Sequence, residues 1–193
     1  MDATLLYHLA LFLHILGAFG LVAAMTFEVI GLQGLRRART REDALTWLGV
    51  ARVVQRLAPA SLGLILVMGL YMTATNWGWM GWIVVALAGL VAIGLIGGLL
   101  TGIRMARIGP AVGRSSGPLS DDLKAALRDP ILLVSLRTRL GIVLGILLLM
   151  TLKPALLPSL VVVVLAGAIG LLTGWISSPR SRDLARAVEA EGR

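Results

Sequence analysis

Five long apolar stretches limit what this chain can fold into. They run from about Thr4 to Leu32, Leu57 to Thr75, Trp82 to Ile103, Leu136 to Leu152 and Leu157 to Ile176. Each approaches or exceeds the roughly 18–20 apolar residues that cross a bilayer as a helix. Backbone polar groups inside a bilayer must be hydrogen-bonded within their own segment, so these stretches predict helices rather than lipid-exposed loops. We therefore expect an all-α fold, a polytopic bundle of five transmembrane helices.

The composition agrees with a membrane protein whose first partner is the lipid bilayer. The chain is 58% hydrophobic and only 15% charged, whereas soluble domains carry about a quarter charged residues. The net charge of +8 does not indicate a nucleic-acid partner, because the basic residues lie between the apolar stretches. The absence of cysteine excludes disulfides and thiolate metal sites.

The basic residues also predict the orientation. Seventeen of the eighteen fall on the linkers 36–56 and 104–139 and on the tail, and only Lys153 lies on an intervening connection. Because cytoplasmic loops carry the excess of Lys and Arg, we expect the N-terminus outside and the C-terminus in the cytoplasm. The transmembrane domain would then cover residues 1–178, and residues 179–193 would form a cytoplasmic tail.

Two of the cytoplasmic linkers carry helix signals of their own. In residues 36–56, Thr40 precedes Glu42 and Asp43, which predicts a capped helix that continues into the second span. In residues 104–135, a Gly/Pro/Ser linker is expected from Gly109, followed by a short surface helix that Ser120 caps and Pro130 ends.

Small residues recur at helical spacing on three spans. The stripes comprise Gly94, Gly98, Gly102 and Ala106; Gly141 and Gly145; and Ala166, Gly170 and Gly174. Small residues allow helix backbones to approach each other closely in a membrane, so we expect each stripe to pack against a neighbouring helix. Dimerisation through one of the stripes is the alternative.

The first span holds both histidines and one buried carboxylate candidate. His8 and His14 differ by about 240° around a helix, so they cannot bind one metal ion together. His14 and Glu28 share a helix face within about 40° but lie about 21 Å apart along it. Lipid solvates neither group, so this face should point into the bundle, whereas His8 is expected at the outer interface.

Glu28 needs a cationic partner at a similar depth. The sequence offers Arg56 on the second span and Arg139 on the fourth, which predicts an intramembrane polar network of these three residues. The network is either a structural ion pair or a carboxylate involved in proton relay or cofactor binding. Lys153 is expected to extend its ammonium to the outer surface, and the methionines are too scattered in sequence to predict a copper site.

The segment "LHILGAFG" (Leu13 to Gly20) resembles the first helix of a group of bacterial membrane families. "ARVVQRLAPASLGLILVMGLYM" (Ala51 to Met72) is similar to their second helix, and "RLGIVLGILLLMTLKP" (Arg139 to Pro154) to a late one. The group comprises the copper-resistance D type, a related integral membrane family of unknown function and the HemJ-like, haem-binding protoporphyrinogen oxidases. The resemblance implies a helical bundle of the bacterial inner membrane, in which His14 corresponds to the histidine that binds haem in the oxidases.

Three functional hypotheses follow. The first is a non-enzymatic helical-bundle protein, an accessory or structural subunit of a membrane complex or a homo-oligomer. The second is a b-type haem protein for electron transfer or porphyrinogen oxidation, in which His14 is the axial metal ligand and Arg56 or Arg139 holds the propionates. The third is a small permease or ion pathway lined by His14, Glu28 and Arg56, although Pro59 and Pro154 are expected at helix ends rather than within broken helices.

Overall fold

The computed structural model describes residues 2–177, which form helices and connecting loops without a strand; the tail predicted at 179–193 lies outside this range. The elements are α1 (Ala3–Arg37), α2 (Arg41–Met72), η1 (Thr73–Trp77), α3 (Gly81–Ile96), η2 (Gly97–Gly102), α4 (Ile103–Arg114), α5 (Asp121–Leu127), α6 (Pro130–Leu152) and α7 (Leu156–Ile176). The elements η1 and η2 are π-helical, with backbone bonds from residue i to i+5.

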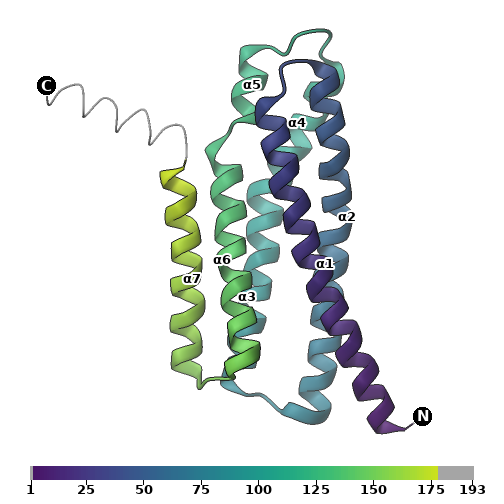
Figure 1. Cartoon of the computed structure of the whole chain (residues 1–193), viewed down its shortest axis with the longest axis vertical. Helices are drawn as coiled ribbons and strands as arrows, with labels where there is room; N and C mark the ends of the chain where they lie inside the picture. The colour runs from purple at the N-terminus through teal and green to yellow at the C-terminus, as the bar shows by residue number, and fades with distance from the viewer. Residues whose placement is uncertain (1, 178–193) are drawn as a thin grey trace, which may run out of the picture.

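Five helical segments are long and apolar enough to cross a membrane. They are Ala3–Arg37, Arg41–Trp77, Gly81–Arg114, Asp121–Leu152 and Leu156–Ile176. The first four run 32–37 residues, well beyond the predicted spans, because the helices continue past the apolar stretches at one end of the bundle. We call this end, which holds α5 and the loops at 38–40 and 115–120, the α5 end (Figure 1).

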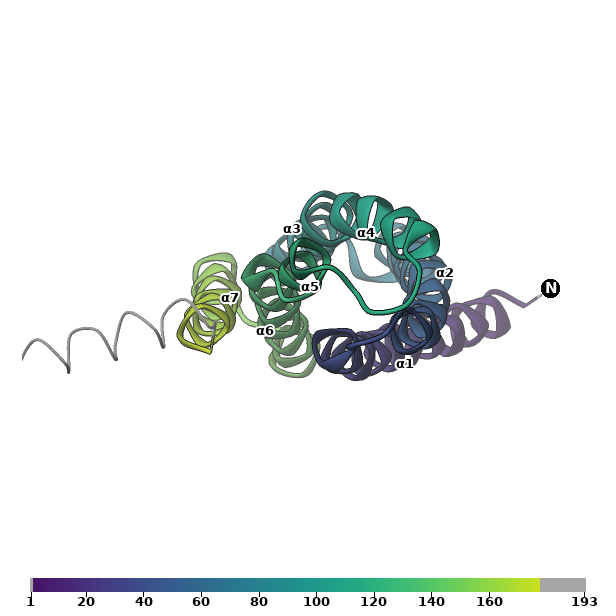
Figure 2. The same cartoon turned by 90° about the horizontal axis from the view of Figure 1, so that it is seen from above.

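Viewed along its axis, the bundle is a ring with one helix outside it (Figure 2). The ring is formed by α1, α2, the continuous α3–η2–α4 segment and α6, while α7 packs on the outer side of α6. The α6–α7 contact uses the predicted small residues. A Cβ on Gly141 would overlap the backbone of Ala166, and one on Gly170 would overlap the backbone of Arg137. The close approach expected for these two stripes is therefore confirmed.

Two hydrophobic clusters stabilise the ring at different heights. One lies at the α5 end and joins α1, α2, α4, α5 and α6 around Leu35, Val112 and Leu136. The other lies further along the bundle and joins α1, α3, α6 and α7 around Leu21, Ile93 and Leu149. The first cluster explains why the helices extend past the apolar stretches, since they pack on one another there as in a soluble protein.

The predicted caps are confirmed at both linkers. The Thr40 hydroxyl accepts a bond from the Asp43 backbone N–H at 3.2 Å, and the Asp43 carboxylate accepts one from the Thr40 N–H at 3.3 Å. This capping box begins one continuous helix, α2. Ser120 likewise caps α5, with its hydroxyl accepting from the Leu123 N–H.

The prediction that a flexible linker begins at Gly109 is wrong. The helix α4 continues through Pro110 to Arg114, and the loop begins only at Ser115. The reason is tertiary: Ile108 and Val112 are buried in the cluster at the α5 end. Their burial outweighs the weak helix preference of glycine and proline.

Candidate functional site

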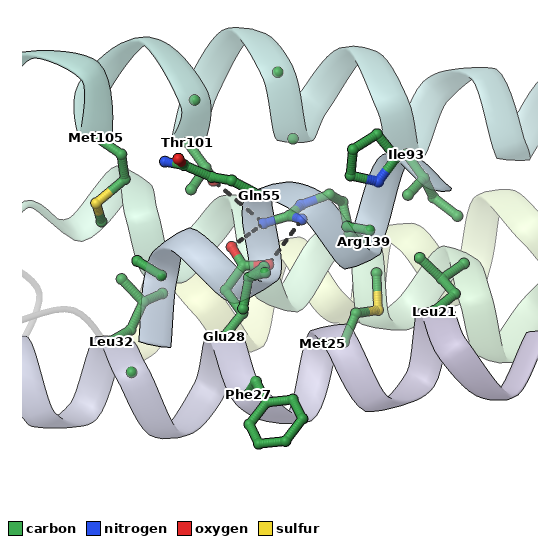
Figure 3. Close-up of a pocket in the computed structure, with 18 of the residues that line it drawn as sticks. Leu21, Met25, Phe27, Glu28, Leu32, Gln55, Ile93, Thr101, Met105 and Arg139 are labelled. Atoms are coloured by element: carbon green, nitrogen blue, oxygen red, sulfur yellow. Dashed lines mark hydrogen bonds and ion pairs between the residues drawn. The ribbon is translucent and has the colours of Figure 1, made fainter. Parts of the chain in front are cut away.

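The deepest charged groups in the ring form one ion pair. Glu28 on α1 and Arg139 on α6 are 8% and 5% exposed. Arg139 donates from Nη1 to Glu28 Oε2 at 3.0 Å and from Nη2 to Glu28 Oε1 at 2.5 Å (Figure 3). Such a bidentate contact fixes the guanidinium and the carboxylate in one plane. The structure thus joins two members of the predicted network.

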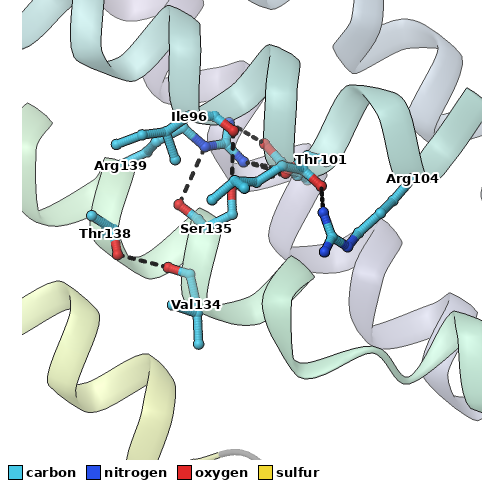
Figure 4. A network of polar contacts seen from close by, with 9 residues as sticks. Ile96, Thr101, Arg104, Val134, Ser135, Thr138 and Arg139 are labelled. Carbon is cyan, nitrogen blue, oxygen red and sulfur yellow. Dashed lines mark hydrogen bonds and ion pairs between the residues drawn. The ribbon is translucent and has the colours of Figure 1, made fainter.

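Polar groups of α6 and η2 hold the guanidinium in place. Arg139 Nε donates to the carbonyl of Ser135 at 3.3 Å, and Nη2 donates to the hydroxyl of Thr101 at 3.2 Å (Figure 4). The Ser135 hydroxyl lies 3.0 Å from that of Thr101 and donates to the carbonyl of Ile96 at 3.4 Å. Since η2 begins directly after Ile96, the Ser135 hydroxyl bonds to the backbone at the point where the α-helix becomes a π-helix.

A cavity of about 320 Å³ adjoins this ion pair inside the ring. Its walls come from α1, α2, α3, η2, α4 and α6 and are mostly apolar. Four of its lining residues are polar or charged: Glu28, Gln55, Thr101 and Arg139. A cavity of this size falls at the lower end of the range for small-molecule sites, which are usually apolar with a few convergent polar groups.

One wall of the cavity is the glycine stripe of α3 and η2. A Cβ added at Gly94 or Gly98 would meet no atom within 4 Å, and both residues line the cavity. The expectation that this stripe packs against another helix is therefore wrong. The glycines instead leave open space in front of their backbone. The same spacing in the sequence fits either a helix contact or a cavity wall.

The cavity opens sideways between α2 and the α3–η2 segment. Four of the five lining residues that are themselves exposed lie on these two elements: Gln55 and Pro59 on α2, and Gly94 and Gly98 opposite. The fifth is Phe27 on α1. Pro59 lies inside α2 rather than at a helix end, contrary to the expectation. Because proline has no N–H, the backbone carbonyl of Gln55 at this mouth loses its usual helical donor.

Arg56 does not join the network. Its side chain is exposed, and the residue is outside the cavity lining. It follows Gln55 directly, and one residue turns a helix by about 100°, so Arg56 faces away from the position that Gln55 occupies. The prediction that Arg56 contacts Glu28 is wrong for this geometric reason.

His14 occupies a different site nearer the opposite end of the bundle. Its Nδ1 lies 3.0 Å from the carbonyl of Ile65 on α2. A carbonyl only accepts, so Nδ1 donates and Nε2 of the neutral ring keeps its lone pair. His14 lines a second cavity of about 100 Å³ together with Met72 and Met150. The methionines that are distant in sequence thus partly converge, whereas His8 is exposed, as expected for an interface residue.

These residues do not fit one haem held by His14 and Arg139. Arg139 binds Glu28, which lies about 21 Å from His14 along α1, farther than a haem iron is from its own propionates. The cavity beside His14 is also smaller than the roughly 300 Å³ of ordinary small-molecule sites. Within residues 2–177, no three His, Cys, Asp or Glu residues come together as metal ligands.

Sequence reasoning did not identify Gln55, Thr101 and Ser135 as site residues. Two signals are present in hindsight: Ser135 precedes Arg139 by one helical turn, and Thr101 interrupts a glycine-rich stretch. Lys153 is exposed, and its ammonium lies 4.2 Å from the centre of the Trp77 ring, a cation–π contact that was not predicted.

Comparison with protein-family models, with curated proteins and with solved structures finds no match to this chain.

Proposed function

We propose that the protein is a non-enzymatic bundle of the bacterial inner membrane that binds an amphipathic molecule in the cavity beside Glu28 and Arg139. The single observation that carries this proposal is a cavity of about 320 Å³ with apolar walls, a buried ion pair at one side and a lateral mouth. A molecule with an apolar body can enter such a site from the bilayer. Its polar head then meets the only charged groups that line the cavity.

The proposed orientation places the α5 end in the cytoplasm. Arg107, Arg114 and Arg128 are exposed at this end, and basic residues near a membrane favour the cytoplasmic side. The segment Ala3–Phe27 of α1 spans about 37 Å, slightly more than the roughly 30 Å hydrocarbon core. Since α1 is inclined in the bundle, Glu28 would lie near the inner headgroup layer (Figure 1).

An accessory role in a larger membrane complex, or in a homo-oligomer, is compatible with this proposal. The anchored Nδ1 of His14 is consistent with the resemblance to haem-binding and copper-resistance families, because ligating histidines usually donate their other ring N–H. The geometry supports the cavity more strongly than the haem hypothesis, since Arg56 and Arg139 are not placed to hold the propionates.

Two glycine variants test the proposal. Gly98→Leu should fill part of the cavity, because Gly98 lines it and a Cβ there meets nothing within 4 Å, so the new side chain starts in open space. Gly63→Leu is the matched control, since Gly63 on α2 also has no neighbour within 4 Å but lies outside the cavity. Native mass spectrometry of the full chain released from nanodiscs should show bound amphiphile on the wild type and on Gly63→Leu, and little on Gly98→Leu. Equal binding to all three proteins would refute the cavity as the binding site.

A further inference from the structure

We infer that the ligand of this cavity is a zwitterionic phospholipid, whose phosphate lies at Arg139 and whose ammonium lies at Glu28. This inference rests on the proposed function and names the class of its ligand. It follows from the charge of the site, from the hydrogen-bonding capacity left in it, and from where its mouth opens.

The charge of the site is balanced. Glu28 and Arg139 are the only charged residues among those that line the cavity, and they neutralise each other. A purely anionic head group would lie close to the like charge of the Glu28 carboxylate, and a purely cationic one close to that of the Arg139 guanidinium. In both cases one charge has no opposite neighbour in a poorly solvated cavity. A zwitterion brings one charge of each sign, so every charge keeps an opposite neighbour.

The ion pair also keeps unused hydrogen-bonding capacity. A guanidinium has five N–H donors, and the described contacts of Arg139 use four of them: one on Nε, one on Nη1 and two on Nη2. The remaining N–H is on Nη1, the atom that faces the cavity-lining Gly97. The carboxylate of Glu28 has about four acceptor sites, of which the bonds from Arg139 occupy two. An anionic acceptor and a cationic donor can therefore both bind without separating the pair.

The mouth of the cavity supplies a further acceptor for an ammonium. Pro59 leaves the backbone carbonyl of Gln55 without its helical donor, and both residues line the exposed side of the cavity. Gln55 lines the same cavity as Thr101 and Arg139, and its side chain projects over these two residues in the view of Figure 3. Acceptors thus continue from Glu28 towards the opening.

The lateral opening favours a phospholipid over a free zwitterion. Leu21 and Leu62, which lie about two helical turns from Glu28 and Gln55 respectively, line an apolar part of the cavity, which suits an acyl chain rather than water. The mouth lies between two membrane-spanning segments, so a head group can enter while its remaining chain stays in the bilayer. The depth proposed for Glu28 is that of the inner headgroup layer, where such heads are concentrated.

The test uses the full chain in nanodiscs of equal phosphatidylethanolamine and phosphatidylglycerol, with bound lipid identified by native mass spectrometry. Wild-type protein should be enriched in phosphatidylethanolamine by about tenfold, the ratio that 1.4 kcal/mol produces. Glu28→Gln removes the negative charge and should reverse the preference towards phosphatidylglycerol. The matched control Glu42→Gln removes an exposed carboxylate far from the cavity and should keep the wild-type preference.

Three outcomes would overturn the inference. Wild-type protein that binds both lipids equally, or prefers phosphatidylglycerol, contradicts a zwitterionic ligand while leaving the proposed cavity function intact. Displacement of the lipid by soluble phosphoethanolamine at equal concentration would assign the site to a free zwitterion instead. Absence of any bound lipid on the wild type would overturn this inference and the proposed function together. If Glu28→Gln does not fold, Gln55→Leu replaces it and should lower the phosphatidylethanolamine preference several-fold.

Discussion

At the scale of single residues, the Glu28–Arg139 pair is the feature on which both the site and the ring depend. A buried ion pair contributes little net stability compared with an apolar pair, but removal of one partner leaves the other charged and unpaired. The sequence could propose the pair because Glu28 has few possible partners at its depth. It could not choose between Arg139 and Arg56, because that choice depends on how α1, α2 and α6 are rotated within the ring.

Arg139→Leu should lower the free energy of unfolding by about 3–5 kcal/mol, because Glu28 is left buried without its cation. Glu28→Gln combined with Arg139→Leu should recover a large part of this loss. Unfolding in a mild detergent, followed by circular dichroism, measures the effect. Arg104→Leu is the control: the Arg104–Asp129 pair is 28% exposed on both sides, and its loss should cost no more than about 1 kcal/mol. Equal losses for the two arginine variants would contradict the burial argument.

At the scale of elements, local signals in the sequence predicted helix starts well and helix contacts only in part. Thr40 and Ser120 cap α2 and α5 as expected because a cap needs only neighbours within three residues. Local sequence does not show which glycine stripe packs against a helix and which lines a cavity. Gly141 packs against α7 and Gly98 lines the cavity, although both lie in apolar stretches at similar spacing. Which glycine meets a helix depends on the tertiary arrangement.

Thr40→Ala should destabilise α2 by about 1 kcal/mol, because the N–H of Asp43 loses its acceptor. The matched control is Thr46→Ala on the same helix, where the hydroxyl only donates back to the Glu42 carbonyl and its loss should be nearly neutral. Hydrogen exchange of the first turn of α2 reports the difference. Unchanged exchange in Thr40→Ala would show that the capping box is not formed.

Glycine substitutions distinguish the helix contact from the cavity wall. Gly170→Ala should lower the melting temperature clearly, since its Cβ would overlap the backbone of Arg137 and separate α6 from α7. Gly94→Ala should leave it unchanged or raise it, because the added methyl meets open space and alanine is the better helix former. Thermal unfolding of both variants in one detergent decides the matter. A larger loss for Gly94→Ala would mean that the cavity wall is packed against another helix.

At the scale of the whole molecule, the chain has two ends of different character. At the α5 end the helices extend past the apolar stretches, pack on a hydrophobic cluster of their own and expose arginines. The opposite end has short connections at 78–80 and 153–155. The apolar stretches were enough to predict five helical segments, but not that four of them enclose a cavity while α7 lies outside the ring. That arrangement depends on contacts between segments distant in sequence.

The orientation of these two ends can be tested directly because the chain contains no cysteine. Asn76→Cys places a thiol near the short connection at 78–80, and Ser116→Cys places one in the loop at the α5 end; both positions are exposed. In intact spheroplasts, a membrane-impermeant maleimide should label Asn76→Cys and leave Ser116→Cys unlabelled until the membrane is permeabilised. The reverse pattern would place the α5 end outside, against the distribution of the arginines. It would also put the Glu28–Arg139 cavity in the outer headgroup layer, so the lipid that binds there would have to come from the other leaflet.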